Sequence, residues 1–234
     1  MICIPVAAAT QEEALQAIQK SAGLADVLEL RMDLISGGNV KELVGAVRAA
    51  SSSVKVLVTN RSDDPGRSSA EEERIGVLLD GVRSGADFVD VELATMPVWR
   101  ERLRSLIAEH GDHTRLVVSH HDFLKTPSLK TLIGFLDKSV SAGARVVKIV
   151  TFARSPEDNL PVLSLIPYAR RRDMDIIACC MGEHGRISRV MAPLLGSLFT
   201  FASLERGAES ASGQLTVREM RQIFRILAGK NPDC

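Results

Sequence analysis

The sequence has no excess of charge of either sign. Its 234 residues include 29 lysines and arginines and 29 aspartates and glutamates, so the formal net charge is zero. A chain without a global field does not attract nucleic acid or an anionic membrane over long distances. We therefore expect neither as a partner, and an anionic small molecule must be held by particular arginine or lysine side chains.

Paired cysteines and long apolar runs are also missing. No C-x-x-C pair occurs among the four cysteines, Cys3, Cys179, Cys180 and Cys234, which argues against a disulfide framework or a zinc cage. No apolar stretch approaches the roughly 20 residues of a membrane span. The N-terminus lacks the basic start of a signal peptide, so we expect a cytoplasmic protein.

Short apolar runs do recur along the chain at a fairly even spacing. Most are rich in Val, Ile and Leu with little alternation, which is typical of strands buried on both faces of a parallel sheet. The eight predicted strands cover residues 2–6, 27–31, 54–59, 88–93, 115–119, 145–150, 175–180 and 197–201.

Stretches with helical periodicity lie between these runs. The eight predicted helices cover residues 12–20, 40–50, 70–83, 99–109, 128–141, 156–172, 187–194 and 214–228. The alternation gives about 29 residues per unit, the size of a βα repeat in a barrel. An open doubly wound sheet shares the alternation, but eight units and the absence of G-x-G-x-x-G after the first strand favour closure. We predict a (β/α)₈ TIM barrel, a single domain over residues 1–234.

In such a barrel, chemistry occurs at the carboxyl ends of the strands. Lys148 lies inside the apolar run Val146-Val147-Lys148-Ile149-Val150, where an ammonium group is costly to bury. Burial and nearby arginines favour the neutral amine, which is the nucleophilic form. A single such lysine often extends to solvent at a strand end, but polar residues on the neighbouring strand ends favour a catalytic role.

Two adjacent histidines follow the predicted fifth strand, next to the strand of Lys148. Either His121 or its neighbour His120 is suited to acid–base work near neutral pH. Only one of them should point into the site because strand residues alternate in direction, and the sequence leaves the choice open. Paired histidines also suggest a metal, but the other histidines supply no convincing third ligand, so we predict no metal site.

Further charged residues lie at other predicted strand ends. Three arginines come from different barrel segments: Arg31, Arg61 and Arg189. Such guanidinium groups suit a carboxylate and neighbouring hydroxyls. Glu29 shares the face of Arg31 and is placed to orient a histidine. Asp90 and Glu92 also share a face, where a catalytic role and an internal salt-bridge network remain open alternatives.

Together these residues resemble the type I 3-dehydroquinate dehydratase family of the shikimate pathway, whose fold is similar to that of aldolases with a barrel lysine. The resemblance runs through nearly the whole chain in the same order. Its pieces are Glu29-x-Arg31-x-Asp33, Thr59-x-Arg61, Asp90-Val-Glu92, Ser119-His-His121-Asp122-Phe123 with Thr126-Pro127, Lys148-Ile149, Met181-Gly182, Ser188-Arg189 and Ser210-x-x-Gly213-Gln214.

The resemblance implies a dehydratase that turns 3-dehydroquinate into 3-dehydroshikimate through a Schiff base on Lys148, without a cofactor. His121 would move the protons, Glu29 would pair with His121, and Arg189 would bind the substrate carboxylate. The other contacts to the ring hydroxyls and the carboxylate would come from Arg31, Arg61, Ser210 and Gln214. The resemblance also implies a homodimer, although no predicted helix has an obvious apolar stripe for the contact.

The sequence departs from the family pattern in two places. Bacterial members often have Glu-Gly-Gly soon after the arginine of the third strand, whereas here Asp64 or Arg67 would take that role in the polar connection 60–73. Ser212 stands where proline often precedes Gly-Gln, which predicts a more mobile closing loop.

The alternative to the dehydratase is a class I aldolase acting on a keto acid or a sugar phosphate. It would also use Lys148 but would cleave a carbon–carbon bond. A sugar-phosphate barrel usually has a glycine-rich phosphate site after its seventh and eighth strands. Here that region supplies Arg189 and the segment 210–214, which suit a carboxylate and hydroxyls better.

Overall fold

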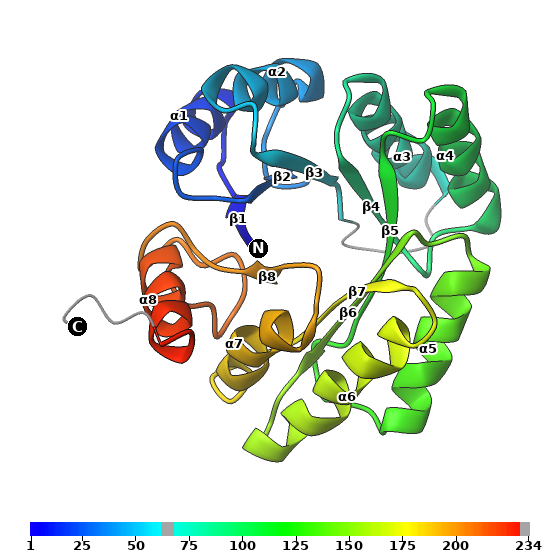
Figure 1. The fold of residues 1–234 in the computed structure, drawn as a ribbon. Helices are drawn as coiled ribbons and strands as arrows, with labels where there is room; N and C mark the ends of the chain where they lie inside the picture. The colour runs from blue at the N-terminus through cyan, green and yellow to red at the C-terminus, as the bar shows by residue number, and fades with distance from the viewer. Residues whose placement is uncertain (62–67, 230–234) are drawn as a thin grey trace.

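The computed structural model describes residues 1–61 and 68–229, in which eight strands alternate with eight α-helices around a ring (Figure 1). The strands are β1 Ile2–Val6, β2 Val27–Arg31, β3 Lys55–Thr59, β4 Phe88–Glu92, β5 Arg115–His121, β6 Val146–Phe152, β7 Asp175–Met181 and β8 Thr200–Phe201. The helices are α1 Gln11–Ser21, α2 Val40–Ala50, α3 Ser68–Arg83, α4 Pro97–Glu109, α5 Leu129–Ser141, α6 Asn159–Arg170, α7 Arg186–Leu195 and α8 Val217–Leu227, with a 3₁₀ turn η1 at Pro156–Asp158.

The strands form one parallel sheet in the order β7-β6-β5-β4-β3-β2-β1-β8. The ring is completed just before β8, where the N–H of Leu198 donates to the carbonyl of Ile176 in β7 at 2.8 Å. This nearly closed arrangement confirms the predicted (β/α)₈ barrel and excludes the open doubly wound sheet.

Most predicted boundaries agree with the structure, and the differences have local causes. β8 holds only two residues, and the segment before it is fixed by one backbone hydrogen bond of Leu198 and by the side-chain hydrogen bonds of Ser197. Helix α8 starts at Val217, later than predicted, because Thr216 caps it. The Thr216 hydroxyl accepts from the backbone of Glu219, whose carboxylate accepts in return from the Thr216 N–H.

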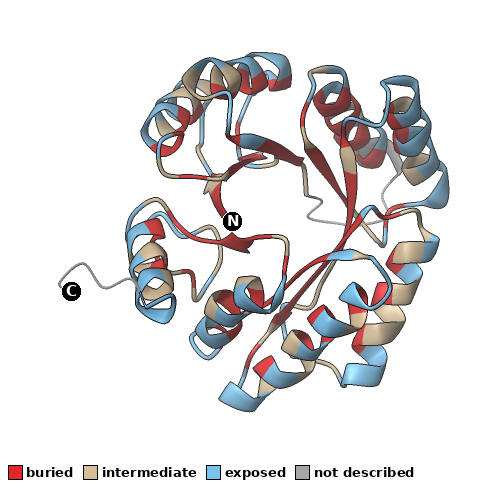
Figure 2. Ribbon diagram, viewed as in Figure 1, coloured by how far each residue is buried: buried red, intermediate tan, exposed pale blue. Residues whose placement is uncertain are grey.

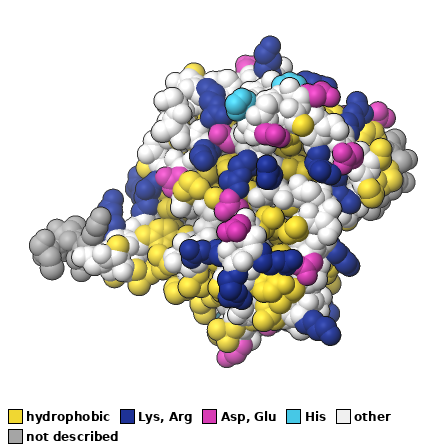
Figure 3. Space-filling view, turned by 45° about the vertical axis from the view of Figure 1, so that its right-hand side comes forward, with side chains coloured by type: hydrophobic (Ala, Val, Ile, Leu, Met, Phe, Trp, Pro, Cys, Tyr) yellow, Lys and Arg dark blue, Asp and Glu magenta, His cyan; other side chains and the backbone are white. Residues whose placement is uncertain are grey.

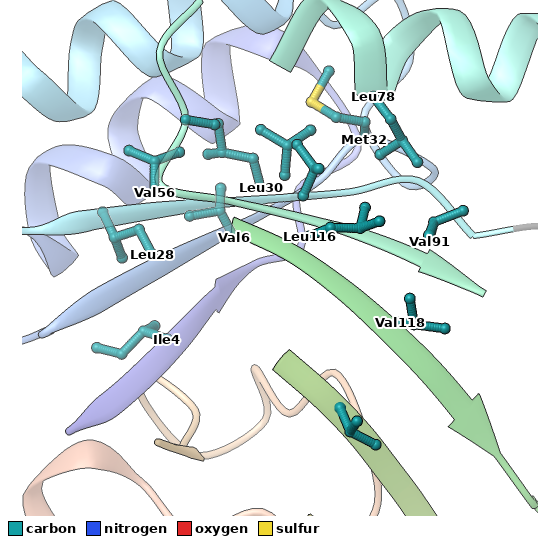
Figure 4. Close-up of a cluster of buried hydrophobic side chains, with 14 of the residues drawn as sticks. Ile4, Val6, Leu28, Leu30, Met32, Val56, Leu78, Val91, Leu116 and Val118 are labelled. Atoms are coloured by element: carbon teal, nitrogen blue, oxygen red, sulfur yellow. The ribbon is translucent and has the colours of Figure 1, made fainter. Parts of the chain in front are cut away.

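The strands direct alternate residues to opposite sides of the barrel wall. Residues on the outer side pack against the apolar faces of the helices and form the main core (Figures 2 and 4). Leu30, Val91 and Val118 belong to it. The inner side forms a second, smaller cluster that fills the barrel: Cys3, Val27, Leu57, Phe88, Val117, Val146, Ile177, Phe199 and Phe201. This cluster, the apolar plug, fills the interior of the barrel. The next inward-pointing residues lie above it, toward the carboxyl ends of the strands.

Helix α7 buries polar side chains against the barrel and exposes most of its large apolar ones. Its buried residues include Ser188 and Arg189, and the Ser188 hydroxyl accepts from the N–H of Cys180 at 2.8 Å. The large apolar side chains of the helix lie on the exposed face: Ile187, Met191, Leu194 and Leu195. The prediction that no helix offers an apolar stripe was therefore wrong. The polar contacts of Ser188 and Arg189 with the barrel turn the apolar side of α7 outward.

The surface shows no large field of one sign on the face seen in Figure 3, where basic and acidic side chains are interspersed. This distribution fits the zero net charge. None of the helices in the described part of the chain is long and apolar enough to cross a membrane.

Candidate active site

A cavity of about 410 Å³ opens at the carboxyl ends of the strands, above the apolar plug. All eight residues that the sequence analysis selected line it: Glu29, Arg31, Arg61, His121, Lys148, Arg189, Ser210 and Gln214. The two-residue period of a strand explains why. Glu29 comes two residues after Val27 of the plug, and Lys148 comes two residues after Val146. Both side chains therefore point inward, one layer higher.

Lys148 is buried at the floor of the cavity, with 4% of its surface exposed. Its Nζ lies 2.9 Å from Oδ2 of Asp90, 3.5 Å from Oε1 of Glu29 and 4.6 Å from the ring centre of Phe201. From the sequence, only burial and nearby arginines were expected around this amine. The structure adds two carboxylates, Glu29 and Asp90, which both form ion pairs with Nζ of Lys148.

Asp90 joins the lysine to a buried network. Its carboxylate accepts from Arg61 at 2.7 Å and from the hydroxyl of Ser119 at 2.6 Å, as well as from Lys148. Burial alone would raise the pKa of Asp90, but the cationic Arg61 and Lys148 outweigh it and hold that pKa below its usual range. The internal salt-bridge network left open by the sequence is therefore present, and it includes Lys148.

Glu29 lies across the barrel from Lys148. Its Oε1 accepts from the hydroxyl of Thr59 at 2.9 Å and lies near Lys148. The pairing of Glu29 with His121 that the resemblance implied is not found among the described residues. The two residues come from β2 and β5, with β3 and β4 between them, and the Glu29 carboxylate is engaged by Thr59 and Lys148 instead.

The structure distinguishes the two adjacent histidines. His121 lines the cavity, and its ring is stacked at 5.8 Å from the ring of Phe123. His120 points out of the barrel and stacks on Phe135 of α5 at 3.7 Å. Burial, followed by the nearby Arg61 and Lys148, lowers the pKa of His121 well below its ordinary value. The imidazole is therefore neutral at pH 7 and able to accept a proton.

Arg189 is a buried cation without a carboxylate partner among the described residues. Only 2% of its surface is exposed. One terminal nitrogen donates to the carbonyl of Ser212 at 3.2 Å, and Nε has no hydrogen-bond partner in the described part of the chain. Arg31, in contrast, is paired with Asp33 at 2.5 Å. A buried guanidinium group that lines a cavity and has a donor without an acceptor is suited to an anionic ligand.

The turn that carries Ser210 and Gln214 is held by internal contacts. The Gln214 side chain accepts from the N–H of Ser210 and donates to its hydroxyl, at 2.9 and 3.1 Å. The hydroxyl of Ser212 accepts from the N–H of Gly182 at 3.1 Å. Ser212, from which a more mobile loop was expected, thus adds a hydrogen bond between this turn and the end of β7.

Asp64 and Arg67, named for the missing Glu-Gly-Gly segment, lie outside the described residues. Thr59 and Ser119 were part of the resemblance but had been given no role, and in the structure they hold Glu29 and Asp90. The strand period would have indicated both, since they stand two positions before an inward Arg61 and His121. No cluster of three or more potential metal ligands occurs in residues 1–61 and 68–229.

Comparison with known proteins places this arrangement in a family. A family model described as type I 3-dehydroquinase matches residues 2–231. The 3-dehydroquinate dehydratase of Desulfotalea psychrophila is 35% identical over 225 residues, which cover 95% of this chain and 96% of the relative. That of Methanococcus maripaludis is 33% identical over 232 residues, 97% of this chain and 100% of the relative.

A solved structure agrees with the sequence matches. The crystal structure of 3-dehydroquinate dehydratase from Geobacillus kaustophilus is 29% identical and has a TM-score of 0.86, with coverage of 97% of this chain and 91% of that one. The whole fold is therefore shared with a protein of the same name as the sequence relatives. The chain belongs to the type I 3-dehydroquinase family.

Proposed function

We propose that the protein is a hydro-lyase that converts 3-dehydroquinate to 3-dehydroshikimate and water, in the shikimate pathway towards chorismate. Family membership supports this substrate, since the relatives bear the name 3-dehydroquinate dehydratase. The observation that carries the proposal is that one cavity holds both a buried Lys148 and the guanidinium group of Arg189, whose Nε has no hydrogen-bond partner among the described residues. The first suits a ketone, and the second suits a carboxylate.

The reaction starts with a Schiff base. The amine of Lys148 attacks the ring ketone. One amine proton and the proton first taken from the ammonium group move to the carbonyl oxygen, which leaves as water and gives a protonated imine. The ammonium group must first lose a proton. Asp90 is a poor acceptor because its pKa is held low, so we assign the proton to Glu29, whose Oε1 lies 3.5 Å from Nζ.

His121 then carries out the elimination. It removes a proton from the carbon next to the imine, and the electron pair of that C–H bond moves into a neutral enamine. The enamine expels the hydroxyl group on the next carbon, which takes the proton back from His121 and leaves as water. One imidazole suffices if both groups leave from the same face. Water finally cleaves the imine and frees Lys148, so these steps need no metal or organic cofactor.

The rest of the cavity orients the substrate. Arg189 binds the carboxylate with charge-assisted hydrogen bonds. The ring hydroxyls, and part of the carboxylate, are bound by Arg31, Arg61, Ser210 and Gln214, which line the same cavity. Membership of the type I 3-dehydroquinase family favours this reaction over the class I aldolase alternative.

Turnover of 3-dehydroquinate, followed by the ultraviolet absorbance of the conjugated product, tests the proposal. We expect activity in the purified protein and none in Lys148→Met. His121→Ala should lose at least about 100-fold in kcat, the size of a general acid–base contribution. His120→Ala is the matched control, since that ring lies outside the cavity, and it should keep kcat. Full activity in His121→Ala would refute the assigned role.

We further propose a homodimer that uses the exposed face of α7. Four large apolar side chains gather there, at positions 187, 191, 194 and 195, and Leu160 of the neighbouring α6 is 64% exposed. An apolar stripe on a surface helix is typical of an interface between copies. Leu194→Asp should therefore give monomers by light scattering after gel filtration. Ile226→Asp, on the exposed side of α8, should leave the dimer intact.

We also propose that the protein works in the cytoplasm. The supporting observation is that Cys3, Cys179 and Cys180 are free and buried, as is usual for proteins of a reducing compartment. Fractionation of cells that express the full chain tests this, and recovery with secreted proteins would contradict it.

A further inference from the structure

Arg74 of helix α3 is a buried cation just outside the cavity. Only 7% of its surface is exposed, and it is not among the residues that line the cavity. Burial of a guanidinium group is costly unless its donors are used. The acceptors of Arg74 therefore indicate what its burial achieves.

The acceptors belong to three different elements. One terminal nitrogen donates to the hydroxyl of Thr95, after β4, at 2.8 Å, and lies 3.4 Å from Oε1 of Glu71 in α3. The other donates to the carbonyl of Asn60, after β3, at 3.3 Å. The side chain of Asn60 donates in return to the carbonyl of Arg74, also at 3.3 Å. Arg74 thus ties α3 to the carboxyl ends of two neighbouring strands.

Both of these strand ends carry a residue of the cavity wall. Arg61 follows Asn60 directly, and Glu92 ends β4. The Glu92 carboxylate lies between two guanidinium groups, with Oε2 at 3.7 Å from Arg74 and Oε1 at 4.0 Å from Arg61. Arg61 in turn donates to Asp90, which contacts Lys148. A continuous chain of charges therefore runs from α3 to the cavity wall and to the lysine.

We propose that Arg74 is a positioning residue that holds Arg61 and Glu92 in place to bind the ring hydroxyls of the substrate. This inference rests on the proposed function, because it assigns the Arg61 side of the cavity to hydroxyl groups. The network is not optimised for stability alone. Nε of Arg74 and Oε2 of Glu71 are buried without a hydrogen-bond partner among the described residues. Networks that leave buried polar atoms unpaired contribute little net stability, which points to a role in geometry.

Loss of Arg74 should affect binding more than chemistry. Lys148 and His121 keep their own contacts, whereas the wall formed by Arg61 and Glu92 loses its support. We expect Arg74→Met to raise KM about tenfold and to change kcat less than about threefold, the pattern for lost uniform binding. Arg74→Lys keeps the charge but cannot reach all the acceptors. Its KM should therefore lie between that of the unaltered protein and that of Arg74→Met.

The test compares these variants with Arg83→Met, a matched control. Arg83 is on the same helix, exposed and paired with Asp80, and its loss should leave KM unchanged. The decisive measurement repeats Arg74→Met in an Arg61→Met background. If Arg74 acts through Arg61, Arg74→Met should raise KM by less than about twofold in the Arg61→Met background. The effects of substitutions within one network are not additive.

The outcomes separate this inference from the proposed function. No turnover by the unaltered protein refutes the proposed function itself. Turnover with an unchanged KM in both Arg74 variants refutes the positioning role alone. A rise in KM of the same size in both backgrounds shows a merely structural effect and also overturns the inference. If Arg74→Met does not fold, the same comparison is made with Arg74→Lys, which retains the charge against Glu71 and Glu92.

Discussion

Replacement of Arg189 by methionine should lower kcat/KM without lowering the free energy of unfolding. Each hydrogen bond from a charged group contributes roughly 1.5–3 kcal/mol, so the loss of two such bonds to a carboxylate costs about 3–6 kcal/mol of substrate binding in the transition state. At about 1.4 kcal/mol per factor of ten, kcat/KM should fall roughly 100-fold to 10,000-fold. Arg186→Met is the control, because Arg186 is on the same helix but is exposed and paired with Glu183.

The free energy of unfolding should behave differently. Arg189 is buried, has one acceptor in Ser212, and leaves Nε without a partner among the described residues. Its replacement by an apolar side chain of similar length removes an uncompensated buried charge, so urea denaturation should show equal or greater stability. The reasoning would be refuted if kcat/KM stayed within about threefold of the value of the unaltered protein. The loss of two charge-assisted hydrogen bonds should have a larger effect.

Because burial and nearby cations lower the pKa of His121 well below its ordinary value, the acid limb of the kcat/KM profile should fall well below pH 6.5; a limb above pH 6.5 would contradict the assigned base. Asp90→Asn should lose about 3 kcal/mol or more of stability at pH 7, because it breaks a buried pair. Since the pKa of Asp90 is lowered in the folded protein, its contribution is present above the unfolded value of about 3.9 and is lost as pH falls below it. The difference in urea stability between Asp90→Asn and the unaltered protein should therefore shrink at low pH, and a constant difference would argue against the charge. Gly213→Ala should raise KM strongly, because an added Cβ would overlap the carbonyl of Gly182, whereas Gly207→Ala, with a similar positive φ but open space around it, should leave KM unchanged.

Much of the cavity could be predicted because a strand has a strict two-residue period. Once the apolar strands are located, Glu29 and Arg31 must share a side, as must Lys148 and the plug residue Val146. The same rule makes only one of His120 and His121 face inward. It does not say which one, because that depends on the register of β5 against its neighbours, and register is set by the packing of the whole sheet.

The contacts between distant strands could not be predicted. Glu29 and Lys148 are 119 positions apart and meet only because the closed sheet brings β2 and β6 to opposite sides of one cavity. The exposed apolar side of α7 was missed for a related reason. No apolar stripe was predicted for any helix, but the contacts of Ser188 and Arg189 with the barrel leave the large apolar side chains of α7 exposed. The tertiary contacts of Ser188 and Arg189 with the rest of the barrel thus decide which side of α7 is buried.

The Schiff base on Lys148 is tested most directly by borohydride reduction in the presence of 3-dehydroquinate, with mass spectrometry of the digested protein. The imine mechanism predicts a reduced adduct on the peptide that contains Lys148, and no adduct in Lys148→Met. A protein that turns over 3-dehydroquinate but gives no adduct, or gives one on another lysine, would contradict the mechanism.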